Sequence, residues 1–266
     1  MNLAPLLIAE LFILGLVIGY FAGLLGIGGG MLMVPFLVFV LSGQGVSEAY
    51  VVKMAVATSL ATICFTSLSS VRAHHKQGAV LWPVALVLAP GILIGSLAGA
   101  NLAVALPAKA LTVLFALFVT FSATQMLLNK KPKPGRSLPG SVGMFGVGSV
   151  IGLVSSMVGA GGAFVSVPFM AWCNVTIHKA VATSAALGFP IALAGAFGYV
   201  LAGWGRADLP PGAWGYLYLP GLVCIALGSI LTAPVGARAA HKMDIAPLKK
   251  VFAIFLYVMA AYFLFR

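Results

Sequence analysis

Long apolar runs separated by short polar or glycine-rich breaks follow one another along the whole chain. A helix needs roughly 20 apolar residues to cross about 30 Å of hydrocarbon, and most of these runs are long enough. The pattern predicts an all-α, polytopic transmembrane bundle. The runs comprise residues 3–25, 31–41, 46–70, 79–102 and 108–128, and then 141–158, 163–173, 177–202, 216–235 and 247–265.

Two of the runs are too short to span a bilayer in the ordinary way. Runs 31–41 and 163–173 have roughly 11 residues each, which is about 17 Å of helix rise. Each follows a glycine-rich stretch, so we expect broken helices at both places. The pattern leaves open whether these short segments cross the membrane or re-enter on the side they came from.

The chain is a duplication. Residues 26–36 match residues 159–169, and the sequence Ala-Val-Ala-Thr-Ser at 55–59 recurs at 180–184. We therefore predict a first transmembrane repeat at 1–128, a basic cytoplasmic linker at 129–140 and a second repeat at 141–266, each repeat with about five segments of which one is short.

The distribution of lysine and arginine favours inverted repeats. If all five segments of each half cross, eleven basic residues lie on one side and four on the other, which is the bias expected of cytoplasmic loops. The larger group is Arg72, Lys76, Lys130, Lys131, Lys133, Arg136, Lys179, Arg238, Lys242, Lys249 and Lys250, and the smaller is Lys53, Lys109, Arg206 and Arg266. Re-entrant short segments would nearly remove this bias.

Composition agrees with lipid as the main solvent. Hydrophobic residues make up 62% of the chain and charged residues only 7%, with a mean hydropathy of +1.13. A soluble domain could not bury so much apolar surface. The net charge of +11 resides in short loops, so it indicates membrane topology and not nucleic-acid binding.

The glycine breaks are the first candidate for a substrate site. Interruptions at matching places in two halves are the best sequence pointer to a transporter's site, and the helix that follows each break offers free N–H groups to an anion. Tight turns without a binding role are the alternative. The candidate residues are Gly26, Gly28, Gly29, Gly30, Gly159, Gly161 and Gly162.

Hydroxyl side chains accompany the breaks in both halves. Thr58, Ser59, Thr183 and Ser184 are candidate substrate-binding residues, although hydrogen bonds to a neighbouring helix would explain them equally well. Anion guidance or ion coupling is a second candidate role, for Lys53, His178, Lys179 and Glu10. Snorkelling to the membrane surface is the alternative for the cations, and an interfacial position is the alternative for Glu10.

No enzymatic motif is recognisable in the sequence, and His74 and His75 fall in a predicted loop. Histidine, cysteine and carboxylate residues lack metal-ligand spacing, and no nucleophile stands beside a plausible base. We expect neither a metal nor a cofactor, and an intramembrane enzyme is the weakest of the alternatives.

The chain resembles the sulfite exporter TauE/SafE family of membrane permeases. The resemblance rests on residues 26–35 and 159–168, on the two Ala-Val-Ala-Thr-Ser stretches, and on residues 74–80 leading to Trp82. It implies transport of a small sulfur-containing anion such as sulfite or sulfoacetate, usually outward.

Together these observations predict a secondary transporter for a small anion, working by alternating access of two repeats. An uptake permease and a channel-like pore remain the alternatives. The expected partners are the anionic substrate and the lipid bilayer, without nucleic acid, and the sequence leaves a homo-oligomer open. We expect the inner membrane of a prokaryote, with the basic loops in the cytoplasm.

Overall fold

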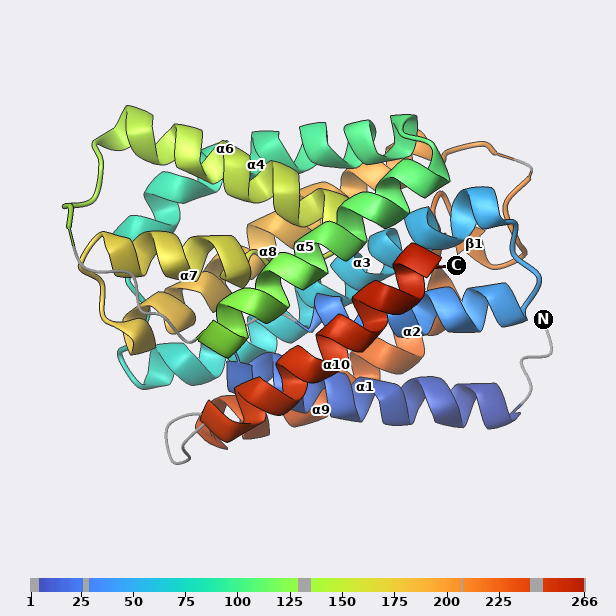
Figure 1. The fold of residues 1–266 in the computed structure, drawn as a ribbon, viewed down its shortest axis with the longest axis horizontal. Coiled ribbons are helices and arrows are strands. Elements are labelled where there is room, and N and C mark those ends of the chain that lie inside the picture. The colour runs from blue at the N-terminus through green and yellow to red at the C-terminus, as the bar shows by residue number, and fades with distance from the viewer. Residues whose placement is uncertain (1–4, 26–28, 129–134, 207, 240–245, 266) are drawn as a thin grey trace.

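A computed structural model describes residues 5–25, 29–128, 135–206, 208–239 and 246–265 (Figure 1). Within them the chain folds into a bundle of helices with one very short hairpin. The predicted all-α membrane bundle is confirmed. The helices are α1 (Pro5–Leu25), α2 (Gly30–Gly43), α3 (Glu48–Lys76), α4 (Trp82–Ala105), α5 (Ala108–Leu128), α6 (Ser141–Val158), α7 (Ala163–Trp172), α8 (Ile177–Ala202), α9 (Leu219–Ala239) and α10 (Ala246–Phe265).

Seven of the described helices are long and apolar enough to cross a membrane. The two segments predicted to be short form α2 and α7, with 14 and 10 residues. One boundary prediction was wrong: His74 and His75 lie in the last turn of α3 and not in a loop. Cations are favourable at the negative end of a helix dipole, and Gly78, with a φ of 65°, follows the helix in a left-handed conformation.

A small hairpin between α8 and α9 was not predicted. Strands β1 (Ala213–Trp214) and β2 (Leu217–Tyr218) pair antiparallel around Gly215 and Tyr216. The sequence pattern extended the apolar run back to Tyr216, because an aromatic, buried hairpin has the same hydropathy as the start of a helix. Gly215 lies against the backbone of Val200 in α8, which leaves no room for a side chain there.

Glycines hold two pairs of helices at close range. In α1, a Cβ on Gly15 would lie 2.9 Å from the Cα of Ile225 in α9, and in α4 a Cβ on Gly91 would lie 3.0 Å from the backbone nitrogen of Ser149 in α6. Close backbone approach through small residues is the usual way for membrane helices to associate. The pairs α1–α9 and α6–α4 occupy corresponding places in the two halves.

The centre of the bundle is formed by α3 and α8, the equivalent long helices of the two halves. They pack against each other, and most of their residues are buried. The remaining long helices surround them, with α5 packed on α10 at one flank. The core therefore lies where the first half meets the second.

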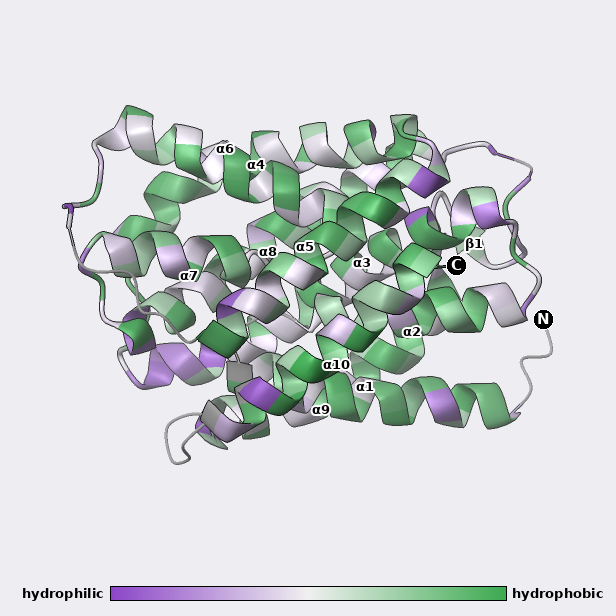
Figure 2. Ribbon diagram, viewed as in Figure 1, coloured by the Kyte–Doolittle hydropathy of each residue, from purple (hydrophilic) through white to green (hydrophobic). Residues whose placement is uncertain are grey.

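Corresponding helices run in opposite directions across Figure 1. There α1 leaves the end of the molecule where both termini lie, and α6 runs towards that end; α2 and α7 start in the middle and run to opposite ends. The hydrophilic residues are also distributed unequally between the two ends of the molecule. The hydrophilic residues at the last turns of α3 and α9 and the first turn of α8 lie at the end away from the termini (Figure 2).

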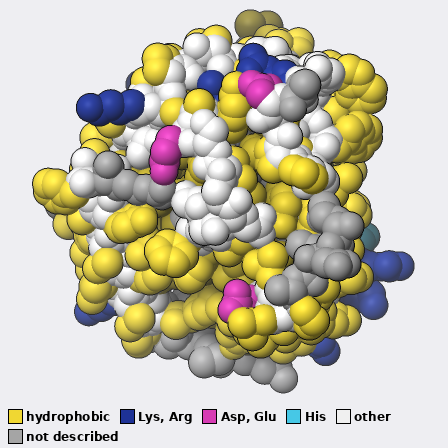
Figure 3. Space-filling model, turned by 90° about the vertical axis from the view of Figure 1, so that its right-hand side faces the viewer, with side chains coloured by type: hydrophobic (Ala, Val, Ile, Leu, Met, Phe, Trp, Pro, Cys, Tyr) yellow, Lys and Arg dark blue, Asp and Glu magenta, His cyan; other side chains and the backbone are white. Residues whose placement is uncertain are grey.

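The end that carries the termini has a mixed charge. Figure 3 shows that acidic side chains lie there beside basic ones, on a surface that is otherwise largely hydrophobic. Glu48 begins α3 at this end, and Lys109 lies in the first turn of α5. This mixed-charge end and the opposite, basic end are the two faces at which a bilayer would meet water.

Candidate functional site

The helix that follows each glycine break starts with the same backbone geometry. Gly29 precedes α2 with φ 75° and ψ −8°, and Gly162 precedes α7 with φ 80° and ψ −8°. This left-handed region suits glycine, because a Cβ there clashes with the backbone. Gly29 and Gly162 are equivalent positions of the duplication, so both halves use glycine in the same way to restart a helix inside the bundle.

The two breaks meet in the middle of the protein. A Cβ on Gly30 would collide with the carbonyl oxygen of Gly159 and would lie 3.0 Å from the Cα of Ala160. The hydroxyl of Ser59 donates a hydrogen bond of 2.9 Å to that same carbonyl oxygen. Gly30 and Ser59 of the first half and Gly159 of the second, all predicted site residues, therefore come together.

A small cavity lies beside the second break. It has room for about one water molecule, with a volume of about 10 Å³. Two predicted residues, Gly161 and Ser184, contribute to its wall. The full lining is Ala22 from α1, Thr66, Ser67 and Ser70 from α3, Gly161 from the break, and Ser184, Ala185 and Gly188 from α8.

The hydroxyl groups around this cavity differ in whether their protons are already donated to another residue. Thr66 and Ser67 donate to carbonyl oxygens of their own helix, those of Thr62 and Cys64. Ser70 is buried, and its Oγ has no hydrogen-bond partner among the described residues. Ser184 accepts a bond of 2.8 Å from Ser166, which leaves its own proton for another acceptor. The donors available to a ligand are thus the hydroxyls of Ser70 and Ser184.

The cavity lies beside the start of helix α7. No charged side chain is among the residues that line it. Helix α7 begins at Ala163 directly after Gly162, and the first N–H groups of a helix have no partner within it. Its positive dipole end is equivalent to roughly +0.5 elementary charge. Such a site can hold a small anion through hydroxyl donors and the helix dipole.

Thr58 and Thr183 each accept a hydrogen bond from the backbone of a residue that precedes a helix. The Oγ1 of Thr58 accepts the backbone N–H of Tyr218 at 2.9 Å, and the Oγ1 of Thr183 accepts that of Leu81 at 3.0 Å. Tyr218 and Leu81 directly precede α9 and α4, so equivalent threonines tether equivalent helix starts. These contacts are of the kind expected under the alternative that the two threonines hydrogen-bond to neighbouring segments.

The proposed guiding and coupling residues lie away from the cavity. Lys53 is near the mixed-charge end and donates to the carbonyl oxygen of Val104 at 2.8 Å, while His178 and Lys179 are exposed at the basic end. Glu10 lies on an outer face of α1 and is part of a separate groove. Gly26 and Gly28 lie outside the described residues.

Six of the eight residues that line the cavity were not predicted, because the sequence analysis concentrated on motifs shared by both halves. Thr58, Thr62, Thr66 and Ser70 recur every four residues along α3, which places them on one helix face. This polar stripe in an apolar helix was a usable signal. It has no counterpart in α8, where the positions equivalent to Thr66 and Ser70 are Ile191 and Gly195.

A second polar cluster closes the mixed-charge end. Tyr50 of α3 donates to the carboxylate of Asp208, and the Arg206 guanidinium lies 4.0 Å from that carboxylate and 5.8 Å from the ring centres of Tyr50 and Tyr216. The hydrogen bond from Tyr50, with Arg206 nearby, holds the pKa of Asp208 below its ordinary value. The cluster therefore fastens the segment before the hairpin to the start of α3.

Buried tyrosines lie beneath this cluster. Tyr216 and Tyr199 are both fully buried, their ring centres are 6.4 Å apart, and the hydroxyl of Tyr199 donates to the carbonyl oxygen of Ser156 near the second break. The side chains between the mixed-charge end and the breaks are thus bulky and closely packed.

Comparison with known proteins gives the same class of protein. The family model of the sulfite exporter TauE/SafE matches residues 11–263. A probable membrane transporter protein of Haemophilus influenzae is 36% identical over 250 residues, covering 93% of this chain and 94% of the relative.

More distant relatives carry similar names. The probable membrane transporter protein YunE of Bacillus subtilis is 29% identical, covering 77% of this chain and 84% of its own, and one from Methanocaldococcus jannaschii is 28% identical, covering 86% and 83%. No solved structure matches the chain significantly. The family and its relatives are transporters, which confirms the prediction that the chain is not an enzyme. With a family model matched over nearly its whole length, this chain is a member of the sulfite exporter TauE/SafE family of membrane proteins.

Proposed function

We propose that this membrane transporter carries a small anion, a sulfur oxyanion or organosulfonate such as sulfite or sulfoacetate, and binds it in the cavity between Ser70 and Ser184. The observation that carries the proposal is the combination of two available hydroxyl donors with Gly161, two residues before the start of α7, in the wall of a cavity without charged lining residues. Hydrogen bonds to a charged group contribute about 1.5–3 kcal/mol each. The family resemblance supplies the sulfur chemistry.

The cavity must widen to accept such an anion, because it holds about one water molecule in the described conformation. We propose that widening comes from movement of two helix groups against each other at the contact of Gly30 with Gly159, one group built around α1–α9 and the other around α4–α6, so that each group contains helices of both halves. The tight pairs α1–α9 and α4–α6 would move as units, since glycine contacts leave their backbones no room to slide. Alternating access requires this kind of rigid-body rocking about a fixed site.

The two halves are proposed to form inverted repeats. Support comes from the opposite directions of α1 and α6 in Figure 1 and from the corresponding tethers of Thr58 and Thr183. The basic end is proposed to face the cytoplasm, as the positive-inside rule prescribes, which puts the Tyr50–Arg206–Asp208 cluster outside.

Export is the proposed direction. A monoanion that leaves a cell with a negative interior gains about 2.3 kcal/mol per 100 mV, so no coupling ion is needed. Uptake would need one, and the candidate acids and cations lie away from the cavity.

Transport by purified protein in liposomes tests the proposal. Sulfite, sulfoacetate and thiosulfate are compared with a small amine, and uptake of labelled substrate against unlabelled substrate on the other side distinguishes a carrier from a pore. We expect saturable anion transport with counterflow. Transport of the amine alone would refute an anion carrier, and anion flux without saturation or counterflow would favour the channel-like alternative.

The substitution Gly188→Ala tests the location of the site. Its methyl group would enter the cavity wall at 3.7 Å from the carbonyl oxygen of Gly161 and at 3.3 Å from the Cβ of Ser67, which must shift by a few tenths of an ångström. We expect correct assembly and at least a tenfold loss of anion affinity. Gly146→Ala is the matched control, because a Cβ there meets nothing within 4 Å. Unchanged affinity in Gly188→Ala would place the site elsewhere.

A further inference from the structure

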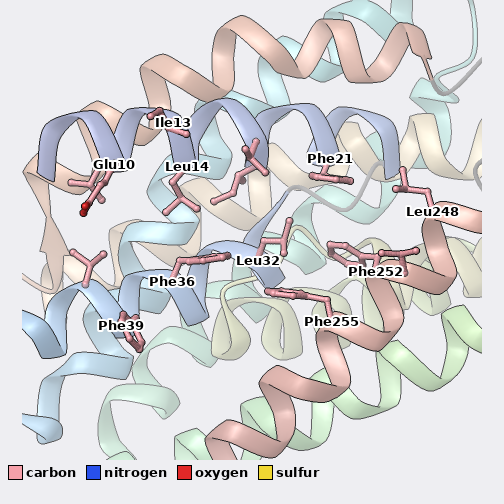
Figure 4. A pocket seen from close by; sticks show the side chains of 15 residues that line it. Glu10, Ile13, Leu14, Phe21, Leu32, Phe36, Phe39, Leu248, Phe252 and Phe255 are labelled. Carbon is pink, nitrogen blue, oxygen red and sulfur yellow. The ribbon is translucent and has the colours of Figure 1, made fainter. Parts of the chain in front are cut away.

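A large apolar groove opens on the outside of the bundle between α1, α2 and α10. Its volume is about 650 Å³, and Figure 4 shows side chains from all three helices directed into one common space. Glu10 lies at one end of the groove, and Leu248 and Phe252 lie towards the other. The groove is separate from the small polar cavity, because the two share no lining residue.

Aromatic contacts shape the walls of this groove. Phe36 of α2 stacks on Phe255 of α10 with ring centres 6.1 Å apart, and Phe21 of α1 lies 6.2 Å from Phe252. The rest of the surface is large and aliphatic, and much of it is open to the surroundings: Ile13 is 58% exposed and Val251 is 65% exposed. In a membrane protein such a surface faces the hydrocarbon of the bilayer.

The length of the groove corresponds to one leaflet. Eleven residues separate Glu10 from Phe21 along α1, which is about 16 Å of helix rise. Half of the roughly 30 Å hydrocarbon core is about 15 Å. Glu10 lies near the start of α1, at the mixed-charge end. A lipid chain entering from that leaflet would thus extend along the groove with its head group at Glu10.

Charge identifies the head group. Glu10 is the one charged residue among the side chains that line the groove, so the lining offers no cation to its carboxylate. An ammonium donor would supply both the charge and the hydrogen bonds that a carboxylate accepts. A phosphate-only head group would be repelled, and a quaternary amine has no N–H to donate.

We propose that this groove is a binding site for one phospholipid with a primary ammonium head group, of the phosphatidylethanolamine type. The ammonium pairs with Glu10, and one acyl chain lies between α1, α2 and α10. An acyl chain leaves one apolar environment for another, so it contributes van der Waals packing against the groove, while Glu10 provides selectivity. The site does not depend on which substrate the protein transports.

Native mass spectrometry of protein exchanged into equal mixtures of phosphatidylethanolamine, phosphatidylcholine and phosphatidylglycerol tests this site. Wild-type protein is expected to retain one phosphatidylethanolamine in preference to the others. Glu10→Gln is expected to reduce that preference about tenfold, which corresponds to about 1.4 kcal/mol. Glu48→Gln is the matched control, an exposed acid at the same end of the molecule but outside the groove, and should leave the preference intact.

A second variant tests the chain-binding part without touching the charge. Val17 lines the groove and is 46% exposed, so Val17→Trp should fill the space without disturbing the core. It is expected to release the retained lipid whatever its head group.

Three results would overturn the proposal. The first is a wild-type protein without preference for the ethanolamine lipid, and the second is a Glu10→Gln variant that keeps the preference. The third is a dimer in the mass spectrum that Val17→Trp dissociates, because a second copy of the chain would then be the occupant of the groove.

Discussion

The contact between the two glycine breaks makes Gly30→Ala an informative substitution. Gly30 has an ordinary helical backbone, so alanine is conformationally acceptable there, and only the added methyl group matters. That methyl would collide with the carbonyl oxygen of Gly159 and lie 3.0 Å from the Cα of Ala160. Carbon atoms in ordinary contact are about 3.5 Å apart or more, so the breaks must separate by at least about 0.5 Å.

The cost follows from two effects. Overpacking in a well-packed interior typically costs about 1–3 kcal/mol. Separation of the breaks also strains or removes the hydrogen bond of 2.9 Å from Ser59 to Gly159, which contributes about 0.5–1.5 kcal/mol. We expect Gly30→Ala to lower the free energy of unfolding by about 2–4 kcal/mol from these two effects together.

The measurement is reversible unfolding in mixed detergent micelles, with transport in liposomes as the second readout. Gly146→Ala is the control, since it adds the same methyl group within α6 where nothing lies within 4 Å, and alanine should there be neutral or slightly stabilising. If both variants unfold alike and transport alike, the two breaks do not touch. The proposed movement of the two helix groups against each other at the contact of Gly30 with Gly159 is then refuted.

Three further predictions follow from single contacts. Ser70→Ala should leave stability unchanged or slightly higher, because the Oγ has no hydrogen-bond partner among the described residues. The same variant should raise the half-saturation concentration for the anion about tenfold in transport assays. An unchanged half-saturation concentration would mean that Ser70 is not part of the site. Thr183→Val should cost about 1–3 kcal/mol in detergent unfolding by leaving the N–H of Leu81 unpaired, whereas a loss below 0.5 kcal/mol, of order RT, would mean that the tether is unimportant. Because the pKa of Asp208 is lowered, the stability contributed by its bond to Tyr50 is fully present well above pH 3.8 and is lost as the pH falls through the folded-state value. Hydrogen exchange of residues 208–218, corrected for intrinsic rates, should therefore be constant above about pH 5 and accelerate at lower pH. Asp208→Asn should abolish that dependence, and persistence of it in the variant would assign it to another group.

Hydropathy was sufficient to predict the helices because a bilayer imposes a length on each of them. The boundaries at residues 141, 158, 177 and 202 were found correctly from the apolar pattern and its breaks. The pattern failed where α3 continues beyond its apolar run, as at His74 and His75, because the polar residues there no longer have the hydropathy of a membrane-spanning segment. It also failed at the hairpin around Tyr216, which is buried by tertiary contacts and not by lipid.

The candidate site was predictable only in part. The duplicated motifs correctly indicated that glycine stretches from both halves would meet, as Gly30 and Gly159 do. They did not indicate Ser70 or Gly188, because these residues have no equivalent in the other half. Whether Thr58 or Ser184 faces a cavity depends on helix rotation, which motif matching does not contain.

The polar stripe on α3 has a consequence for kinetics. The first half contributes three hydroxyl residues to the cavity wall, whereas the second contributes one hydroxyl and the glycines beside it. A carrier with inverted repeats alternates between an outward-open and an inward-open form that are related by a pseudo-two-fold axis. Because the hydroxyl residues are unequally divided between the halves, these two forms should bind the same ion with different affinities. The half-saturation concentration measured from one side of the membrane should then differ from that measured from the other side. The final distribution of substrate would be unaffected, because voltage and concentration alone determine it.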